Sequence, residues 1–368
     1  MCYIEQRFEQ LAMEKPTGNQ LVTKWKNDKD IYTGYTATTV FDFQHFSMHD
    51  KSHSIRILQN IELLLGRSRV DLLGVGDLWL LLQVAYFHDI GMSLTSKDMD
   101  KLWESDSKFR EFLREQLKEG RYKDNVELYD AIDYYRKVDQ VLNKKSDFEA
   151  VWKSDPELPT EDWPIRLVQN VQYIITEYVR KHHARRSEDY FERIFQDDKN
   201  FAEGVVERRL YELVGTISCI HTKDFNAVLN ELLYEEVAIG DEHIHPRFAA
   251  AMLRIGDLLD MDNNRFNLRV LEHRGPLPSK SAAHLHKHKA LKNFEITQTS
   301  IKAVSRSEDF TACLEARTWY NWIDSEVAQL IRSWNRIVPQ ALKGGLQSQG
   351  LPGENRIYLK ELEPLQLR

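Results

Sequence analysis

The most apolar stretch of this chain, Leu72 to Phe87, ends in a histidine–aspartate doublet, His88-Asp89. Burying an imidazole or a carboxylate without a partner costs several kcal/mol. A divalent metal ion is a common partner for neutral imidazole and carboxylate together. The stretch is interrupted by Asp77 and Gln83, and it is too short to span a bilayer. The doublet therefore predicts a metal site at the end of a buried helix.

Four further histidine and aspartate residues lie on apolar stripes with helical spacing. A lone histidine on such a stripe is usually a core residue. Because these stripes belong to separate helices, their shared chemistry carries more weight than any single residue. The stripes are Ile57, Ile61 and Leu64 after His53; Val168, Val171, Ile175 and Val179 before His183; Leu210, Val214 and Ile217 before His221; and Ala250 and Leu253 before Asp257.

The composition is that of a soluble globular protein, and its 368 residues suffice for one large domain or two ordinary ones. A net charge of −7 argues against a surface that binds nucleic acid nonspecifically, although it allows a local basic pocket for phosphate. The three cysteines are dispersed, so we expect no disulfide framework and a reducing, cytoplasmic location. The N-terminus lacks the pattern of a signal peptide, and we expect no membrane partner.

The hydrophobic pattern predicts a mostly α protein. We expect an N-terminal segment over 1–40 that leads into a helical domain over 41–270, followed by a small α+β region over 271–368. We expect residues 30–43, rich in Tyr, Thr and Val, to be extended. The charged residues 93–163 predict a helical insertion, either a solvated addition or a cap that selects substrate. These two interpretations are compatible. In the last region we expect short strands over 294–304 and 310–316, a helix over 319–338 and a final strand over 356–359.

Taken in order, these motifs resemble the HD superfamily of metal-dependent phosphohydrolases. The resemblance covers roughly residues 40–270, and it is specific as an ordered set. Within the superfamily, the chain is most similar to the branch often fused to a chaperone-type GHKL ATPase domain in bacterial defence and stress operons. The motifs are His53-Ser-Ile-Arg-Ile, His88-Asp89-Ile-Gly, His183-Ala-Arg-Arg-Ser187, His221 and Arg254-Ile-Gly-Asp257-Leu-Leu-Asp260.

The resemblance implies an HD-type helical bundle that holds two divalent ions. Two such ions a few ångströms apart generate hydroxide at neutral pH and hold the entering and leaving oxygens of a phosphoryl centre. Histidine-rich ligation suits Mn, Fe, Co, Ni or Zn better than Mg, which prefers oxygen ligands. The implied ligands are His53, His88, Asp89 and Asp257 for the first ion, and His183, His221 and a bridging Asp89 for the second.

Basic residues near these ligands would neutralise a phosphate and its developing charge. Arg254, one turn before Asp257, is the strongest candidate for a catalytic role beside Asp89; an ordinary surface charge is the alternative for each cation. His49, one turn before His53, is either a substrate-binding group or an exposed histidine. The candidates for substrate contact are His49, Arg56, Lys181 and Arg185, with Lys51 and Arg186 nearby.

Two further histidine clusters leave alternatives open. His284-x-His286-x-His288 would line one face of a strand and so could bind metal, but the flanking lysines favour a basic surface segment that meets substrate or a partner. His182 could exchange roles with His183, although the family pattern His-Ala-x-x-Ser favours His183.

The function that these motifs imply is hydrolysis of a phosphoester or phosphodiester bond of a nucleotide-like substrate by metal-activated hydroxide. Triphosphate hydrolysis, cleavage of cyclic nucleotides or oligonucleotides, and nuclease action stay open; the acidic net charge favours small nucleotides. The alternative to an enzyme is a regulatory module that senses a nucleotide and turns over little substrate, although six matched ligands favour catalysis. The branch suggests antiviral defence, with an ATPase or a second copy of the chain as candidate partners.

Overall fold

The computed structural model describes residues 2–39, 50–118, 125–144, 163–197, 201, 204–261, 279–306, 309–346 and 358–359. The chain divides into two compact units, of which unit 1 comprises residues 1–93 and 184–368 and unit 2 comprises residues 94–183. The fold is mostly α, as the sequence predicts. Within the described ranges, no helix is both long enough and apolar enough to cross a membrane.

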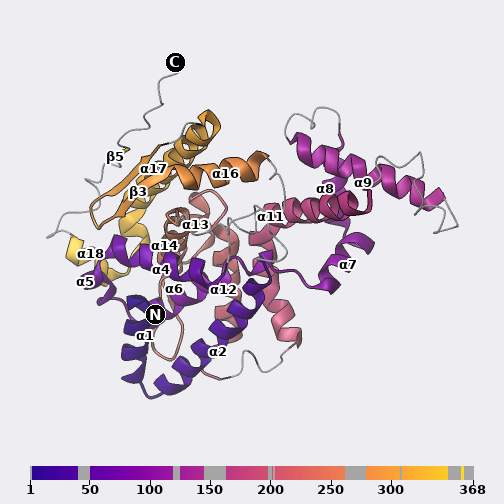
Figure 1. The fold of residues 1–368 in the computed structure, drawn as a ribbon. Coiled ribbons are helices and arrows are strands. Elements are labelled where there is room, and N and C mark those ends of the chain that lie inside the picture. The colour runs from indigo at the N-terminus through magenta and orange to yellow at the C-terminus, as the bar shows by residue number, and fades with distance from the viewer. Residues whose placement is uncertain are drawn as a thin grey trace. The chain divides into compact units, whose positions relative to one another are not determined.

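Unit 1 is built around helix α6 (Val75–Phe87), which is buried at every residue. A helix that is apolar on nearly all sides is typical of a position surrounded by other helices. Its neighbours include α1 (Tyr3–Met13), α2 (Gly18–Ala37), α4 (Lys51–Leu65), α12 (Arg208–Ile220) and α14 (Pro246–Leu258), all labelled in Figure 1. Because α6 is central, His88, which follows its last turn, is also buried.

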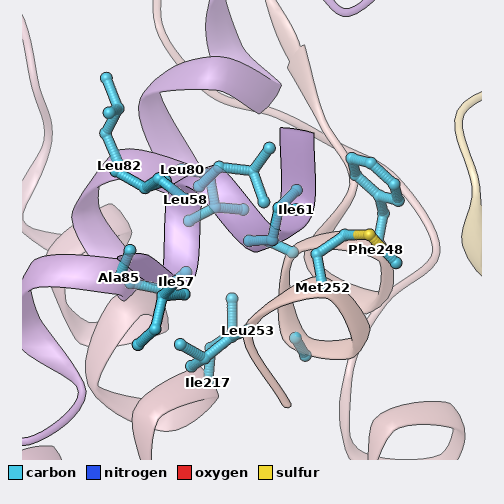
Figure 2. Packing of buried hydrophobic residues seen from close by; sticks show 14 of the residues in the cluster. Ile57, Leu58, Ile61, Leu80, Leu82, Ala85, Ile217, Phe248, Met252 and Leu253 are labelled. Carbon is cyan, nitrogen blue, oxygen red and sulfur yellow. The ribbon is translucent and has the colours of Figure 1, made fainter. Parts of the chain in front are cut away.

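The interface between α4, α6, α12 and α14 is hydrophobic and mostly aliphatic (Figure 2). Burying one leucine or isoleucine side chain stabilises a fold by about 1.5–3 kcal/mol. This packing fixes the helix ends at which the predicted metal ligands lie. The labelled side chains are Ile57, Leu58 and Ile61 of α4, Leu80, Leu82 and Ala85 of α6, Ile217 of α12, and Phe248, Met252 and Leu253 of α14.

Local sequence determines where α4 and α14 begin and end. The Asp50 carboxylate accepts a hydrogen bond of 2.9 Å from the Ser52 N–H, and so caps the N-terminus of α4. The helix ends at Gly66, whose φ of 73° is a conformation that glycine adopts readily. Helix α14 begins with Pro246, whose fixed φ suits a first helical position. His53 is thereby held in the first turn of α4.

Helices α4 and α14 approach each other closely at Gly256 of α14. A Cβ atom at this position would lie 3.0 Å from side-chain carbons of Ile57 and Ile61, and 3.1 Å from the Ile57 carbonyl oxygen. Few real Cβ contacts are so short, so a larger residue here would require the facing part of α4 to move by a few tenths of an ångström. This contact holds together the two helices that carry His53 and Asp257.

We expect the Gly256→Ala substitution to lower the free energy of unfolding by about 1–3 kcal/mol, because α4 must shift to admit the methyl group. The matched control is Gly34→Ala in α2, where nothing lies within 4 Å of an added Cβ atom. Alanine favours helix interiors, so this control should be stabilised by roughly 0.5–1 kcal/mol. Urea unfolding measures both effects. Equal effects of the two substitutions would contradict a close approach at Gly256.

The N-terminal segment is helical, so the expected extended conformation over 30–43 is wrong for residues 30–37, which belong to α2. Trp25, Asp28, Tyr32 and Thr36 share a buried face at helical spacing. Threonine and aromatic residues favour strands, but packing against the core outweighs that propensity here. Residues 40–43 lie outside the described part of the chain.

The C-terminal part of unit 1 combines helices with a small sheet (Figure 1). Strand β3 (Leu291–Ile296) pairs antiparallel with β4 (Ile301–Ser305), with Phe294 opposite Ala303. Strand β5 (Tyr358–Leu359) pairs parallel to β4. The strand structure predicted over 294–304 is therefore a hairpin, and the predicted last strand is confirmed at residues 358–359. The helices here are α16 (Ser279–Ala290), α17 (Phe310–Ile337) and α18 (Gln340–Leu346).

Residues 310–316 begin α17, so the strand predicted there is wrong. Asp309 caps the helix by accepting a hydrogen bond of 2.8 Å from the Thr311 N–H. Ala312, Ala316 and Tyr320 then recur at four-residue spacing and are buried, which is helical and not strand periodicity. The helix predicted over 319–338 is confirmed within α17.

The 284–288 segment belongs to helix α16 and not to a strand, and residues two apart on a helix, such as His286 and His288, do not share a face. His286 is exposed and its Nδ1 lies 2.9 Å from a carboxylate oxygen of Asp309, whereas His288 is buried. The side chain of His284 lies outside the described residues. The strand-based metal site at these positions is therefore wrong.

The remaining elements of unit 1 are short, whereas unit 2 consists of helices with a small aromatic core. In that core the ring centroids of Phe109 and Tyr178 lie 5.0 Å apart. The insertion expected over 93–163 is helical where it is described; the predicted domain boundaries stay predictions. Unit 1 adds α5 (Arg67–Val70), η1 (Ile90–Met92), α13 (Asn226–Glu231), β1 (Glu236–Val237) and β2 (His243–Ile244); unit 2 contains α7 (Ser96–Glu104), α8 (Ser107–Gln116), α9 (Val126–Lys144) and the first part of α11 (Trp163–Asp197).

Candidate metal centre

Five of the predicted metal ligands lie in unit 1 at or near helix ends. His53 lies in the first turn of α4, and Asp257 lies in the last turn of α14. His88 and His221 are the residues at which α6 and α12 end, and Asp89 follows His88. The bundle thus presents candidate ligands from the ends of four helices that pack on one another.

His53, His88 and Asp257 form one group of candidate ligands, whose ligand atoms all lie within 4.8 Å of one another. His53 Nε2 lies 3.3 Å from His88 Nε2 and 3.3 Å from Asp257 Oδ1. Asp89 Oδ2 lies 3.1 Å from His88 Nε2 and 3.5 Å from His53 Nε2. Both imidazoles are buried, whereas 31% of the Asp257 side chain is exposed. Asp257 therefore marks the open side of the group.

The second ring nitrogen of each histidine fixes which nitrogen faces the group. His88 Nδ1 lies 3.2 Å from the Ala85 carbonyl oxygen, which can only accept a hydrogen bond. His88 Nδ1 therefore carries the proton, and Nε2 has a lone pair. His53 Nδ1 lies 2.6 Å from Oδ2 of the Asp260 carboxylate, with the same consequence. An imidazole with a free Nε2 lone pair is the form that binds metal.

This donor set fits a divalent cation. The Nε2 atoms of the two histidines lie 3.3 Å apart, and each lies 3.1–3.5 Å from at least one carboxylate oxygen of Asp89 or Asp257. A proton on one nitrogen would satisfy one pair, whereas a divalent ion satisfies all four acceptors. Desolvation tends to raise the pKa of Asp257, but hydrogen bonding to His53 and the positive charge of the imidazoles, when protonated, hold that pKa well below its usual value. A metal ion would supply positive charge at the same place.

A second group of candidate ligands consists of Asp89, His183 and His221, again with ligand atoms within 4.8 Å of one another. His183 lies on α11, one helical turn before Ser187. The Nδ1 atoms of His183 and His221 bond to carbonyl oxygens three residues earlier, and such a bond from the second ring nitrogen is typical of histidines that bind metal through Nε2. The rings of His221 and His88 lie 5.2 Å apart.

The neighbouring His182 has a different environment. Its Nδ1 lies 2.7 Å from the Tyr178 carbonyl oxygen, and its ring centroid lies 4.5 Å from that of Tyr178. Among the described residues, the two groups of candidate ligands include His183 and not His182.

Ser187 connects α11 to the turn that contains His88. Its hydroxyl donates to the His88 carbonyl oxygen at 2.6 Å and accepts from the Gly91 N–H at 2.9 Å. Arg186 donates to the carbonyl oxygens of Gly91 at 2.7 Å and Ser93 at 3.2 Å. These bonds satisfy buried main-chain groups that would otherwise be costly. They give a physical reason for the serine in the His-Ala-x-x-Ser pattern.

Asp260 is a buried residue to which the sequence interpretation assigned no role. Its carboxylate accepts hydrogen bonds from His53 Nδ1 at 2.6 Å and from Arg56 Nε at 2.8 Å. A carboxylate behind a histidine ligand fixes the tautomer and the orientation of the ring. Its position three residues after Asp257 in the same motif is the signal that could have identified it. The expected substrate contact of Arg56 stays a prediction.

Within the described part of the chain, the structure does not link the other residues expected to contact substrate to the two ligand groups. Arg185 is exposed and forms an ion pair of 2.7 Å with Glu188, while Lys181 Nζ lies 5.8 Å from the ring centroid of Phe112. Residues two apart on a helix do not face the same side, so Arg185 and Lys181 point away from the direction of His183. His49 lies outside the described residues. Their contacts with substrate stay predictions.

Arg254, expected to be the catalytic cation, is buried, with 6% of its side chain exposed. Its Nε and Nη2 atoms donate to the carboxylate of Glu326 on α17, and its Nη1 atom donates to main-chain carbonyl oxygens at the end of α12. These contacts favour a structural role, and the catalytic role stays a prediction. Glu326 was missed from the sequence, although it is a charged residue on the buried stripe of α17.

A family model described as HD-CE matches residues 43–332. The match covers most of the chain and includes every residue of the two ligand groups. It extends beyond residue 270, where the sequence resemblance to the HD superfamily ends, and it includes Glu326. No curated protein and no solved structure matches the chain.

Proposed function

Because the chain belongs to the HD-CE family, we propose that it is a metal-dependent phosphohydrolase that cleaves a phosphoester bond of a nucleotide-like substrate. The observation that carries this proposal is the group formed by His53, His88 and Asp257, with the Asp89 carboxylate 3.1 Å from His88 Nε2 and 3.5 Å from His53 Nε2. Mixed nitrogen and oxygen donors suit Mn, Fe, Co, Ni or Zn.

We assign one ion to His53, His88 and Asp257, and a second ion to Asp89, His183 and His221. Because Asp89 Oδ2 also lies 3.1 Å from His88 Nε2 and 3.5 Å from His53 Nε2, we propose that Asp89 is shared by both ions. Bound divalent ions lower the pKa of water and neutralise charge on a phosphoryl group. The histidines hold their Nε2 atoms toward the site through fixed Nδ1 bonds, and the carboxylates offset the positive charge. The exposed part of Asp257 marks the side from which we propose that substrate approaches.

The cations nearest the ligands have partners within the protein. Arg56 bonds to Asp260, Arg186 bonds to the turn after His88, and Arg254 bonds to Glu326. We therefore propose that the metal ions themselves carry most of the charge balance for phosphate. The net charge of −7 favours small nucleotides over long nucleic acids as substrates. An ATPase partner, self-association, a cytoplasmic location and a role in antiviral defence stay predictions from the sequence.

The test is hydrolysis by purified protein loaded with Mn, Fe, Co, Ni or Zn. The substrates are bis(p-nitrophenyl) phosphate, nucleoside triphosphates, cyclic nucleotides and short oligonucleotides, with products identified by mass spectrometry. We expect turnover that a chelator abolishes and added metal restores. Metal binding without turnover of any substrate would favour the nucleotide-sensing alternative. A folded protein that binds none of these metals would contradict the proposal.

A further inference from the structure

Arg254 and Glu326 form a buried ion pair between α14 and α17. Arg254 Nη2 donates to Glu326 Oε2 at 2.9 Å, and Arg254 Nε donates to Oε1. Only 6% and 7% of the two side chains are exposed. A bidentate arginine–carboxylate pair has a well-defined geometry. Such a buried pair often stabilises a fold no more than apolar residues of the same size. Its presence therefore calls for a role besides stability.

The remaining nitrogen of Arg254 indicates that role. Nη1 donates to the carbonyl oxygens of Ile220 and His221 at 3.0 Å each, and to that of Lys223 at 2.6 Å. The last carbonyl groups of a helix have no partner within the helix, and they form its negative end. Arg254 therefore caps α12 at the turn where His221 lies.

This turn determines where the His221 ring points. His221 ends α12, with φ of −59° and ψ of −25°, and its Nδ1 bonds to the Ser218 carbonyl oxygen within the same turn. Arg254 bonds to the carbonyl groups of Ile220, His221 and Lys223, and so holds the main chain around the His221 ring. A metal ligand must be held within about 0.5 Å of its productive position. A shift of this turn would therefore displace Nε2 from Asp89.

We infer that the Arg254–Glu326 pair positions His221 for the second metal ion, which makes both residues positioning residues of the metal centre. This inference rests on the proposed function. Glu326 orients the guanidinium plane, so that Nη1 faces the end of α12. Without the carboxylate, carbonyl oxygens and the Phe225 ring still face the buried charge of Arg254, but its anionic partner on α17 is lost, and the cap loosens.

The test is titration of the full chain with Co²⁺, followed through its visible absorption and the number of ions bound. In the Glu326→Gln variant we expect the second Co²⁺ to bind about 10–100-fold more weakly, with an altered spectrum, while the first binds as in the wild type. The matched control is Glu5→Gln. Glu5 is a carboxylate of α1 with 3% of its side chain exposed, and it accepts from Lys29 and Trp25. The control should bind both ions normally.

The double variant Arg254→Met/Glu326→Leu separates positioning from stability. Apolar replacements of a buried ion pair often keep or raise stability, but they leave the end of α12 without its donor. We expect a folded double variant that still binds the second Co²⁺ weakly. Normal affinity in Glu326→Gln or in the double variant would overturn the inference, as would a wild type that binds one ion only. A wild type that binds no Co²⁺ would overturn the proposed function as well.

Discussion

The Asp89→Asn variant is expected to lose phosphohydrolase activity by about a thousandfold or more, because metal ions contribute several kcal/mol to stabilising a phosphoryl transition state. Asp89 Oδ2 lies 3.1 Å from His88 Nε2, and the residue also belongs to the group with His183 and His221. Removing its charge therefore weakens both proposed ion sites. The measurement is kcat/KM on the substrate that the panel identifies, together with metal content after dialysis.

Without metal, the same variant is expected to be at least as stable as the wild type. Asparagine keeps the size of aspartate, and its amide can donate a hydrogen bond to His88 Nε2, which lies 3.1 Å from the Asp89 carboxylate. Sites built to bind a metal commonly sacrifice stability in this way. A marked loss of stability in Asp89→Asn would indicate a structural role instead.

Asp28→Asn is the matched control for this prediction. Asp28 of α2 is also buried beside α6, where its carboxylate accepts hydrogen bonds of 2.9 Å from Gln83 and 2.9 Å from Tyr211. Asp28 also pairs with Lys24, so Asp28→Asn removes a buried negative charge at a place that contains none of the candidate ligands. We expect this control to keep its metal content and activity. Equal loss of metal in both variants would contradict the assignment of Asp89.

The Asp260→Asn variant is expected to bind metal about 10–100-fold more weakly in a folded protein. The Asp260 carboxylate accepts from His53 Nδ1 at 2.6 Å and from Arg56 Nε at 2.8 Å. Asparagine offers one acceptor oxygen where aspartate offers two, so one of these donors loses its partner. If His53 loses it, the ring is free to turn away from the site. Competition with a chromophoric chelator measures the change in affinity.

Arg56→Met distinguishes the two donors. It removes the hydrogen bond from Arg56 to Asp260, keeps the one from His53, and retains the aliphatic bulk of the side chain. We expect its metal affinity to stay within a few-fold of the wild type. If Arg56 also contacts substrate, as the sequence predicts, KM rises without a change in metal content. A large loss of metal affinity in Arg56→Met with none in Asp260→Asn would show that Arg56 orients His53 instead.

The helices that carry the candidate ligands could be predicted because apolar periodicity is a local property. Helices α4, α6, α12 and α14 all lie where the apolar stripes place them. Residues 30–37 and 310–316 were misread because threonine and aromatic propensity suggested strands, while the packing of Tyr32 and Tyr320 against the core produced helices.

The supporting residues of the site could not be read in the same way, because their roles depend on contacts between distant segments. Asp260 acquires its role from His53, and Glu326 acquires its role from Arg254. Neither pair leaves a periodic signal. The partners of Arg254 were hidden for the same reason: its proximity to Asp257 in sequence suggested a site cation, and only the fold reveals its bonds to the end of α12 and to α17. Its catalytic role stays a prediction.

The most direct measurement is anomalous scattering from crystals grown with Mn²⁺ or Co²⁺, collected at the absorption edge of the metal. We predict a peak about 2.0–2.2 Å from the Nε2 atoms of His53 and His88 and from carboxylate oxygens of Asp89 and Asp257. Ordered side chains with no peak among them, for every transition metal tried, would contradict a metal centre in this protein.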